Sequence, residues 1–83
     1  ASVIFKALSF VSKNKKNYSV VELKDYFFNE INKTKHLSTE YFEIADGNSL
    51  QKINNWSESI YPVAFTAVNV RDVRLIDNMT IIN

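Results

Sequence analysis

The sequence predicts an α+β fold in which two N-terminal helices pack on a three-stranded antiparallel sheet. Two observations predict it. Apolar residues recur at helical spacing in the first part of the chain, and runs of alternating or β-branched residues follow, separated by turn residues. With 83 residues, the chain is the length of one small domain with a modest core, so we expect residues 1–83 to form a single domain.

The first helix is expected to begin near Val3. Its inward face is predicted at the positions Val3, Ile4, Ala7, Leu8 and Val11, with Lys6, Ser9 and Ser12 outside that face. Because the helix lacks an obvious cap and the chain starts with Ala1 rather than Met, we expect the sequence to be a piece of a longer protein. The lysine-rich stretch 12–17 then reads as a loop.

The second helix has the clearest start signal in the chain. Ser19 followed by Glu22 forms a capping box, in which each side chain bonds to the other residue's backbone amide. The buried stripe of this helix is predicted at Val20, Leu23, Phe27 and Ile31.

The first strand is predicted over residues 40–46. Phe42 and Ile44 alternate with Tyr41, Glu43 and Ala45, so the two sets are expected on opposite faces. The turn residues 46–48 include the only glycine, and residues 49–53 are expected to form one helical turn.

The last two strands are predicted at 62–70 and from Val73 onward, because both segments are rich in β-favouring residues. Their short link, Arg71 and Asp72, indicates an antiparallel hairpin, although it lacks the glycine that such turns favour. We expect Asp77 and Asn78 to end the last strand by bonding to backbone amides.

Composition excludes several classes of function. A net charge of +1 is far from the basic excess of nucleic-acid binders, so the aromatic residues are expected in the core rather than as base-stacking platforms. The chain has no cysteine and a single histidine, which excludes a thiolate zinc site and a histidine cluster. No apolar run approaches the roughly 20 residues that cross a bilayer, and we expect a cytoplasmic protein without a membrane partner.

Candidate catalytic residues are few. His36 lies between the second helix and the first strand and is expected to be an exposed loop residue. A histidine that acts as a general base would need a carboxylate partner and a pocket. Asp72 and Asp77 are conceivable as an acid pair with Arg74 as an anion clamp, but strand alternation places Arg74 on the face opposite Asp77. A structural role is the favoured interpretation, and we assign no catalytic, cofactor-binding or metal-binding residue.

The order of elements and two motifs resemble the C-terminal domain of the pantoate–β-alanine ligase family. A strand of the type Y-x-E-x-x-D followed by a Ser/Thr-Leu pair is matched by Tyr41, Glu43, Asp46, Ser49 and Leu50. The small residues Ala64, Ala67 and Val68 match the next strand. The closing R-L-I-D-N is matched by Arg74, Leu75, Ile76, Asp77 and Asn78, and many members have glycine where this chain has Arg71 and Asp72.

The resemblance implies that residues 1–83 form the lid domain of a two-domain, homodimeric enzyme. Such an enzyme uses ATP with Mg to activate pantoate as an adenylate, which β-alanine then converts to pantothenate. It also implies that a Rossmann-like N-terminal domain, with its His-x-Gly-His-type motif, binds the nucleotide. The alternative is a self-contained α+β module that binds a protein partner. On the first hypothesis, we expect the isolated chain to fold but not to bind ATP measurably.

Overall fold

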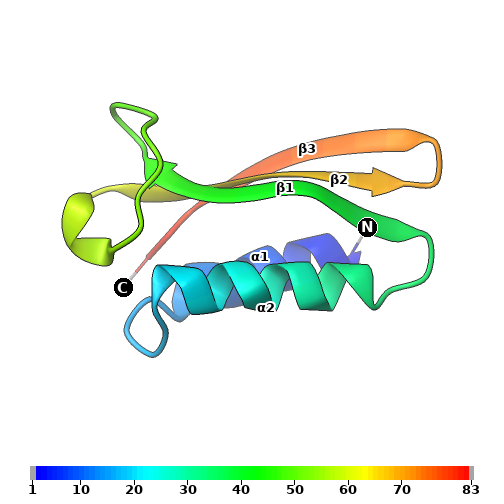
Figure 1. The fold of residues 1–83 in the computed structure, drawn as a ribbon, viewed down its shortest axis with the longest axis horizontal. Coiled ribbons are helices and arrows are strands. Elements are labelled where there is room, and N and C mark those ends of the chain that lie inside the picture. The colour runs from blue at the N-terminus through cyan, green and yellow to red at the C-terminus, as the bar shows by residue number, and fades with distance from the viewer. Residues whose placement is uncertain (1, 83) are drawn as a thin grey trace.

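The computed structural model describes residues 2–82, which form two layers (Figure 1). The helices α1 (Ser2–Lys13) and α2 (Val20–Asn32) make one layer. The strands β1 (Leu37–Asp46), β2 (Pro62–Val70) and β3 (Val73–Thr80) make the other, as an antiparallel sheet in the order β1-β2-β3. The α+β prediction is therefore confirmed. Both helices lie on the same face of the sheet, and no helix of residues 2–82 covers the opposite face.

The helices bury the faces that their spacing predicts. In α2 the capping box is formed, with the Ser19 hydroxyl accepting from the Glu22 amide and Glu22 accepting from the Ser19 amide. The buried residues of α2 are the predicted Val20, Leu23, Phe27 and Ile31.

One prediction on α1 is wrong. Ser12 was expected outside the buried face, but its side chain is buried and donates a hydrogen bond to the Thr80 carbonyl at 2.8 Å. The Ser12 carbonyl also accepts from the Ile82 amide at 2.9 Å. A serine can be buried here because its hydroxyl group has a hydrogen-bond partner at the end of a strand. These bonds tie the end of α1 to the end of β3.

The sheet register places alternate residues of each strand against the helices. Phe42 pairs with Thr66, Ile44 with Ala64, and Val68 with Leu75, on the helix-covered face. Tyr41, Ala67 and Ile76 form a row on the other face. A β-bulge between Thr39 and Tyr41 shifts the register by one residue, and β1 begins earlier than predicted, at Leu37.

The predicted hairpin between β2 and β3 is present, with Val70 paired to Val73. Arg71 takes the left-handed conformation, with φ of 56°, that glycine would favour at the first position of a two-residue turn. Its amide donates to the carbonyl of His36 at 3.1 Å, which fixes the turn against the α2–β1 connection. The prediction that β3 ends at Asp77 and Asn78 is wrong, because pairing continues to Thr80.

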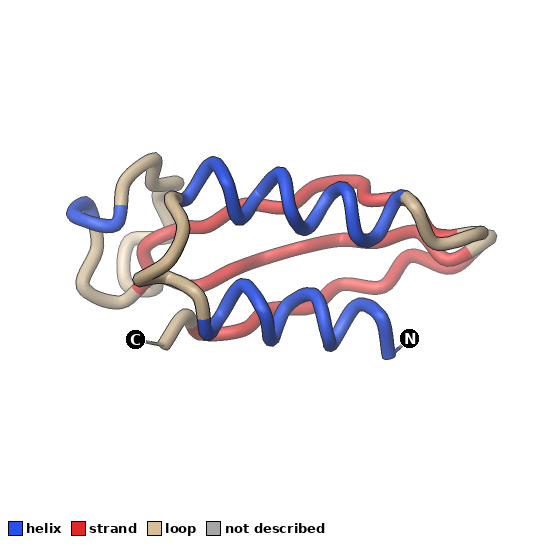
Figure 2. The backbone as a smooth tube through the Cα atoms, turned by 90° about the horizontal axis from the view of Figure 1, so that it is seen from below, coloured by secondary structure: helices blue, strands red, loops and turns tan. Residues whose placement is uncertain are grey.

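The long connection 47–61 differs from its prediction. Residues 49–53 do not form a helical turn; instead Lys52 makes an isolated antiparallel bridge to Ala45. The helical piece lies later, as the 3₁₀ helix η1 (Trp56–Glu58). Figure 2 shows this connection at one end of the molecule, with the helices side by side along the sheet.

The core lies between the two layers. Its largest fully buried side chains are Phe27 and Phe42, whose rings stack with centroids 4.3 Å apart. Strand β3 contributes less: Leu75, on the helix side, is 36% exposed, and Ile76, on the bare side, is 65% exposed. The sheet is therefore buried mainly through β1 and β2.

Candidate functional surfaces

The structure separates the residues that were considered for catalysis. His36 is exposed in the turn between α2 and β1, with a left-handed φ of 70°, and Asp72 is exposed in the hairpin turn. Asp77 accepts from the amide of its neighbour Asn78 at 2.8 Å. Arg74 lies on the face opposite Leu75, as alternation predicts. Within residues 2–82, no three His, Asp or Glu side chains gather as metal ligands would.

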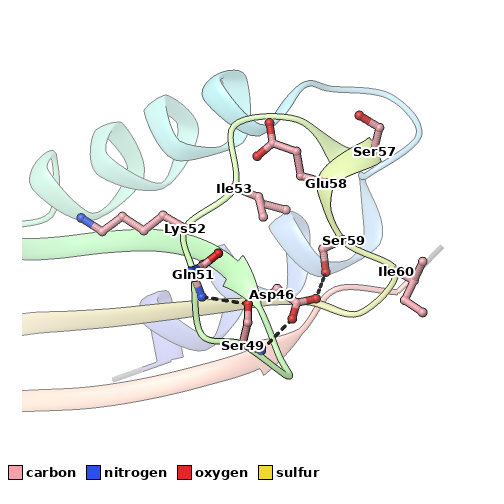
Figure 3. Close-up of a pocket in the computed structure, with 9 residues that line it drawn as sticks. All are labelled: Asp46, Ser49, Gln51, Lys52, Ile53, Ser57, Glu58, Ser59 and Ile60. Atoms are coloured by element: carbon pink, nitrogen blue, oxygen red, sulfur yellow. Dashed lines mark hydrogen bonds between the residues drawn. The ribbon is translucent and has the colours of Figure 1, made fainter.

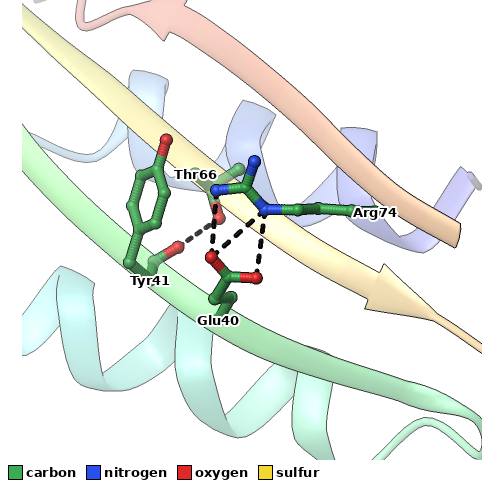
Figure 4. A network of polar contacts seen from close by, with 4 residues as sticks. All are labelled: Glu40, Tyr41, Thr66 and Arg74. Atoms are coloured by element: carbon green, nitrogen blue, oxygen red, sulfur yellow. Dashed lines mark hydrogen bonds and ion pairs between the residues drawn. The ribbon is translucent and has the colours of Figure 1, made fainter. Parts of the chain in front are cut away.

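Arg74 has a partner that the sequence did not reveal. Its Nε and Nη2 atoms donate to both carboxylate oxygens of Glu40, at 2.9 to 3.1 Å (Figure 4). The two side chains come from β1 and β3, the edge strands, and meet across β2 on the bare face. Simple alternation would direct Glu40 toward the helices. The bulge between Thr39 and Tyr41 re-aims the side chain, and no pattern in the sequence marks that bulge.

The ion pair changes the titration of both groups. The hydrogen bonds from Arg74 lower the pKa of Glu40, and the hydrogen bonds to Glu40 raise the pKa of Arg74. Both side chains are half-exposed, so solvent weakens the interaction. The pair fixes the direction of the guanidinium more than it stabilises the fold.

Asp46 organises the long connection at the other end of the sheet (Figure 3). Its carboxylate accepts from the Ser59 hydroxyl at 2.5 Å and from the amides of Asn48 and Ser49 at 3.0 and 2.7 Å. These bonds, led by the one from Ser59, lower the pKa of Asp46. The connection borders an open hollow of about 540 Å³ beside Asp46, lined also by Lys52, Glu58 and Ile60.

We expect Asp46→Asn to loosen the connection 47–61 without unfolding the core. Because the pKa of Asp46 is lowered in the folded chain, ionised Asp46 stabilises the connection fully at pH values above its ordinary pKa of 3.8. This contribution is lost as the pH falls through the pKa of the folded state. The protection of the Asn48 and Ser49 amides against hydrogen exchange should therefore fall in acid in the parent chain. In the variant, this protection should be low at every pH. Asp25→Asn, at an exposed helical carboxylate, is the control. Unchanged protection in Asp46→Asn would show that the backbone alone holds this segment.

The aromatic residues serve several structural roles. Trp56 donates through Nε1 to the Tyr18 carbonyl at 2.9 Å, which fastens the long connection to the α1–α2 loop. Tyr61 lies against Gly47, where a Cβ atom would come within 2.3 Å of the ring. Tyr41 and Phe65 lie half-buried on the bare sheet face.

The described residues do not fit a nucleotide with its magnesium ion. A phosphate cradle needs free backbone amides, usually on glycines. Gly47 is the only glycine in the sequence, its amide donates to the Tyr61 carbonyl at 2.7 Å, and the Tyr61 ring covers it. Among the described residues, neither helix has the length and apolar character needed to cross a membrane.

Known proteins resemble the chain in sequence and in fold. It is 45% identical over 80 residues to a pantothenate synthetase of Azobacteroides pseudotrichonymphae, an alignment that covers 96% of this chain and 29% of that protein. It is 38% identical over 79 residues to one from Bacteroides fragilis, covering 95% of this chain and 27% of the relative.

The chain also superposes on a crystal structure of pantothenate synthetase from Thermus thermophilus, with a TM-score of 0.79 and 20% sequence identity. The superposition covers all of this chain and 30% of the Thermus chain. This likeness shows the fold. The chain thus spans less than a third of the relatives' length and aligns with their C-terminal part. The profile of the family described as Pantoate-beta-alanine ligase matches residues 1–80, and the chain belongs to that family.

Proposed function

We propose that this chain is the C-terminal lid domain of a pantothenate synthetase. The observation that carries the proposal is the 45% identity over 80 residues to the C-terminal part of such an enzyme. The full enzyme would join pantoate and β-alanine. ATP would activate the pantoate carboxylate as pantoyl adenylate with release of pyrophosphate, and the β-alanine amine would displace AMP to form the amide bond.

The chemistry is assigned to the preceding part of the enzyme, a Rossmann-like domain that would hold ATP with Mg. The contribution of this chain is closure. A rigid two-layer domain that covers the adenylate would exclude water, which would otherwise hydrolyse it, and would hold the reacting groups in place. The well-packed core and the fastened connection 47–61 support such a role, because a lid must move as one body. The same proposal places the enzyme in the cytoplasm, as a homodimer.

A chimera tests the proposal. Residues 1–80 of this chain would replace the matching C-terminal segment of the Azobacteroides enzyme, and pantothenate formation would be measured from pantoate, β-alanine and ATP. We expect turnover within about tenfold of the parent enzyme and a far larger loss when the segment is deleted, because closure positions the reacting groups. A folded chimera as inactive as the deletion would contradict the proposal.

Calorimetry on the isolated chain provides the complementary measurement. We expect no specific ATP binding in the micromolar range, with or without pantoate, because the lone glycine amide is already bonded. Micromolar binding would show that this domain carries a nucleotide site of its own.

A further inference from the structure

Strand β3 lies at an edge of the sheet and pairs along one side only, with β2. Seven of its eight residues are exposed. They include the apolar residues Val73 and Ile76, whose side chains are 57% and 65% exposed. A long apolar edge strand is a template on which another strand can form backbone hydrogen bonds, and natural proteins block such edges.

The hairpin geometry determines which backbone groups of β3 point away from β2. The two-residue turn closes on the pair Val70 and Val73, which therefore exchange hydrogen bonds across the hairpin. From Val73 onward, every second residue exchanges bonds with β2, and the residues between them direct their amide and carbonyl groups outward. The residues with outward groups are Arg74, Ile76, Asn78 and Thr80.

Two of these outward groups are already bonded within the chain. The Asn78 amide donates to the Asp77 carboxylate at 2.8 Å, and the Thr80 carbonyl accepts from the Ser12 hydroxyl at 2.8 Å. Both bonds agree with the outward direction that the turn implies. The Asp77 carboxylate occupies an amide that an added strand would use, and Ser12 closes the end of the strand. The stretch from Arg74 to Asn78 is the part of the edge where another strand can pair.

A second copy of β3 fits this stretch in one antiparallel register. Residues that face each other must lie on the same face of the joined sheet, and outward groups must meet outward groups. When Ile76 lies opposite itself across a two-fold axis, Arg74 lies opposite Asn78. Both conditions are then met, and the two strands can form about six backbone hydrogen bonds. Two of the six need the Asn78 amides that Asp77 now holds.

The neighbouring registers are less favourable. A shift by two positions toward Thr80 would place Asp77 opposite itself, with like charges in contact. It would also need the Thr80 carbonyl, which Ser12 occupies. A shift in the other direction would leave only about four backbone hydrogen bonds, because pairing would reach the hairpin turn.

An exposed aromatic side chain on α1 lies beside the same edge. Helix α1 and strand β3 run in the same direction, and Ser12 joins their ends (Figure 1). Phe5 precedes Ser12 by seven residues, so it lies on the same face of α1 and about 10 Å back along the helix. About 10 Å back along β3 from Thr80 is Asp77, three residues earlier. Phe5 is 62% exposed, and it would adjoin the two-fold axis of the paired strands.

We propose that the outer edge of β3 is a strand-addition surface for a second copy of this chain, paired antiparallel about Ile76, and that Asp77 keeps this edge closed. Asp77 acts in two ways. Its carboxylate holds the Asn78 amide, and in the paired strands its charge would lie against Leu75 of the second copy, on the helix side. Removing the carboxylate frees the amide and puts an apolar pair in its place. The inference concerns residues 73–80 alone and does not depend on the proposed function.

Asp77→Val in the 83-residue chain tests the proposal. The mass is measured by sedimentation equilibrium from about 10 to about 300 μM, because association follows mass action. The parent chain should remain at its monomer mass of 9.6 kDa, and the variant should approach twice that mass as the concentration rises. Asp25→Val removes the same charge from an exposed position of α2 and should stay monomeric. Circular dichroism follows the folding of each variant.

Asp77→Ala is measured in parallel, because it removes the carboxylate without adding a branched apolar side chain. It should associate as well, but more weakly than Asp77→Val. Folded variants of Asp77 that stay monomeric would overturn the proposal, and so would equal association of the Asp25→Val control. Unfolding of both Asp77 variants would also overturn it, since Asp77 would then be needed for the fold rather than for blocking the edge.

Disulfide formation tests the register, because the chain has no cysteine of its own. Ile76→Cys and Val73→Cys are each made in the Asp77→Val background. Across the two-fold axis, two copies of residue 76 have Cα atoms about 5.5 Å apart, within disulfide range, whereas two copies of residue 73 are about 20 Å apart. Ile76→Cys should therefore form an intermolecular disulfide at least tenfold faster in air. Equal rates, or faster linking through Val73→Cys, would overturn the proposed pairing.

Discussion

Replacing Phe27 with alanine is expected to leave the isolated domain largely unfolded at physiological temperature. Phe27 is fully buried in α2 and stacks on Phe42 of β1, so it joins the two layers at their centre. Truncating a buried phenylalanine costs about 3–5 kcal/mol through lost burial and the cavity that remains. A small domain has a total stability of only about 5–15 kcal/mol, and an 83-residue chain belongs at the lower end of that range.

The measurement is thermal and urea unfolding followed by circular dichroism. A loss of about 1 kcal/mol lowers Tm by roughly 4–8 °C in a domain of this size, so the midpoint should fall by tens of degrees. Phe5→Ala is the matched control, since Phe5 is 62% exposed on α1 and should change stability by no more than about 0.5 kcal/mol. Similar losses in both variants would mean that the layers do not pack through Phe27.

Helical spacing predicted the helical layer almost completely. The capping box and the apolar stripe of α2 are local signals, because both depend only on residues within the helix, and the structure contains both. The prediction for Ser12 is wrong because its partner, the Thr80 carbonyl, is 68 positions away in the sequence. A long-range bond of this kind leaves no local trace.

The three strands and the hairpin between β2 and β3 were predicted, but the details of the sheet were not. Alternation put Phe42 and Ile44 on the core side, and both are buried. The bulge at Glu40 could not be foreseen, since it depends on how β1 pairs with β2 rather than on β1 alone. The helical turn expected at 49–53 was wrong because the bonds of Asp46 to Ser49 and Ser59 favour a turn instead.

The surface features depended most on tertiary structure. Arg74 was placed on the correct face by alternation, yet its partner Glu40 belongs to a strand two positions across the sheet. The gathering of Leu50 with Phe65 and Ile76 on one face likewise brings together three separate segments. Sequence motifs identified the family to which these residues belong, but only the fold shows that they share a surface.

Arg74→Ala is expected to lower turnover of the full-length chimera by roughly 10–100-fold while leaving the domain folded. Arg74 lies on the face of the sheet that the helices leave bare, where its Nε and Nη2 atoms donate to the Glu40 carboxylate. On the lid hypothesis, a small shift of the closed domain misplaces groups that it never touches, and misplacement of about 1 Å can cost about a hundredfold in rate. In the isolated chain, Tm should change by no more than a few degrees, because the ion pair is half-exposed.

Glu40→Gln distinguishes an effect of the Glu40–Arg74 ion pair on turnover from an effect of Arg74 on domain closure. The hydrogen bonds from Arg74 lower the pKa of Glu40. The pair therefore contributes its full stability at pH values above 4.5, the ordinary pKa of Glu40, and loses it as the pH falls through the pKa of the folded state. At neutral pH the pair is fully formed, and Glu40→Gln removes its charge while Arg74 stays. If Arg74 itself meets the preceding domain, Arg74→Ala should slow steady-state pantothenate formation clearly more than Glu40→Gln does. Equal losses would assign the effect to the pair within the sheet, and unfolding of the isolated Arg74→Ala chain would make the arginine a structural residue rather than part of the closing surface.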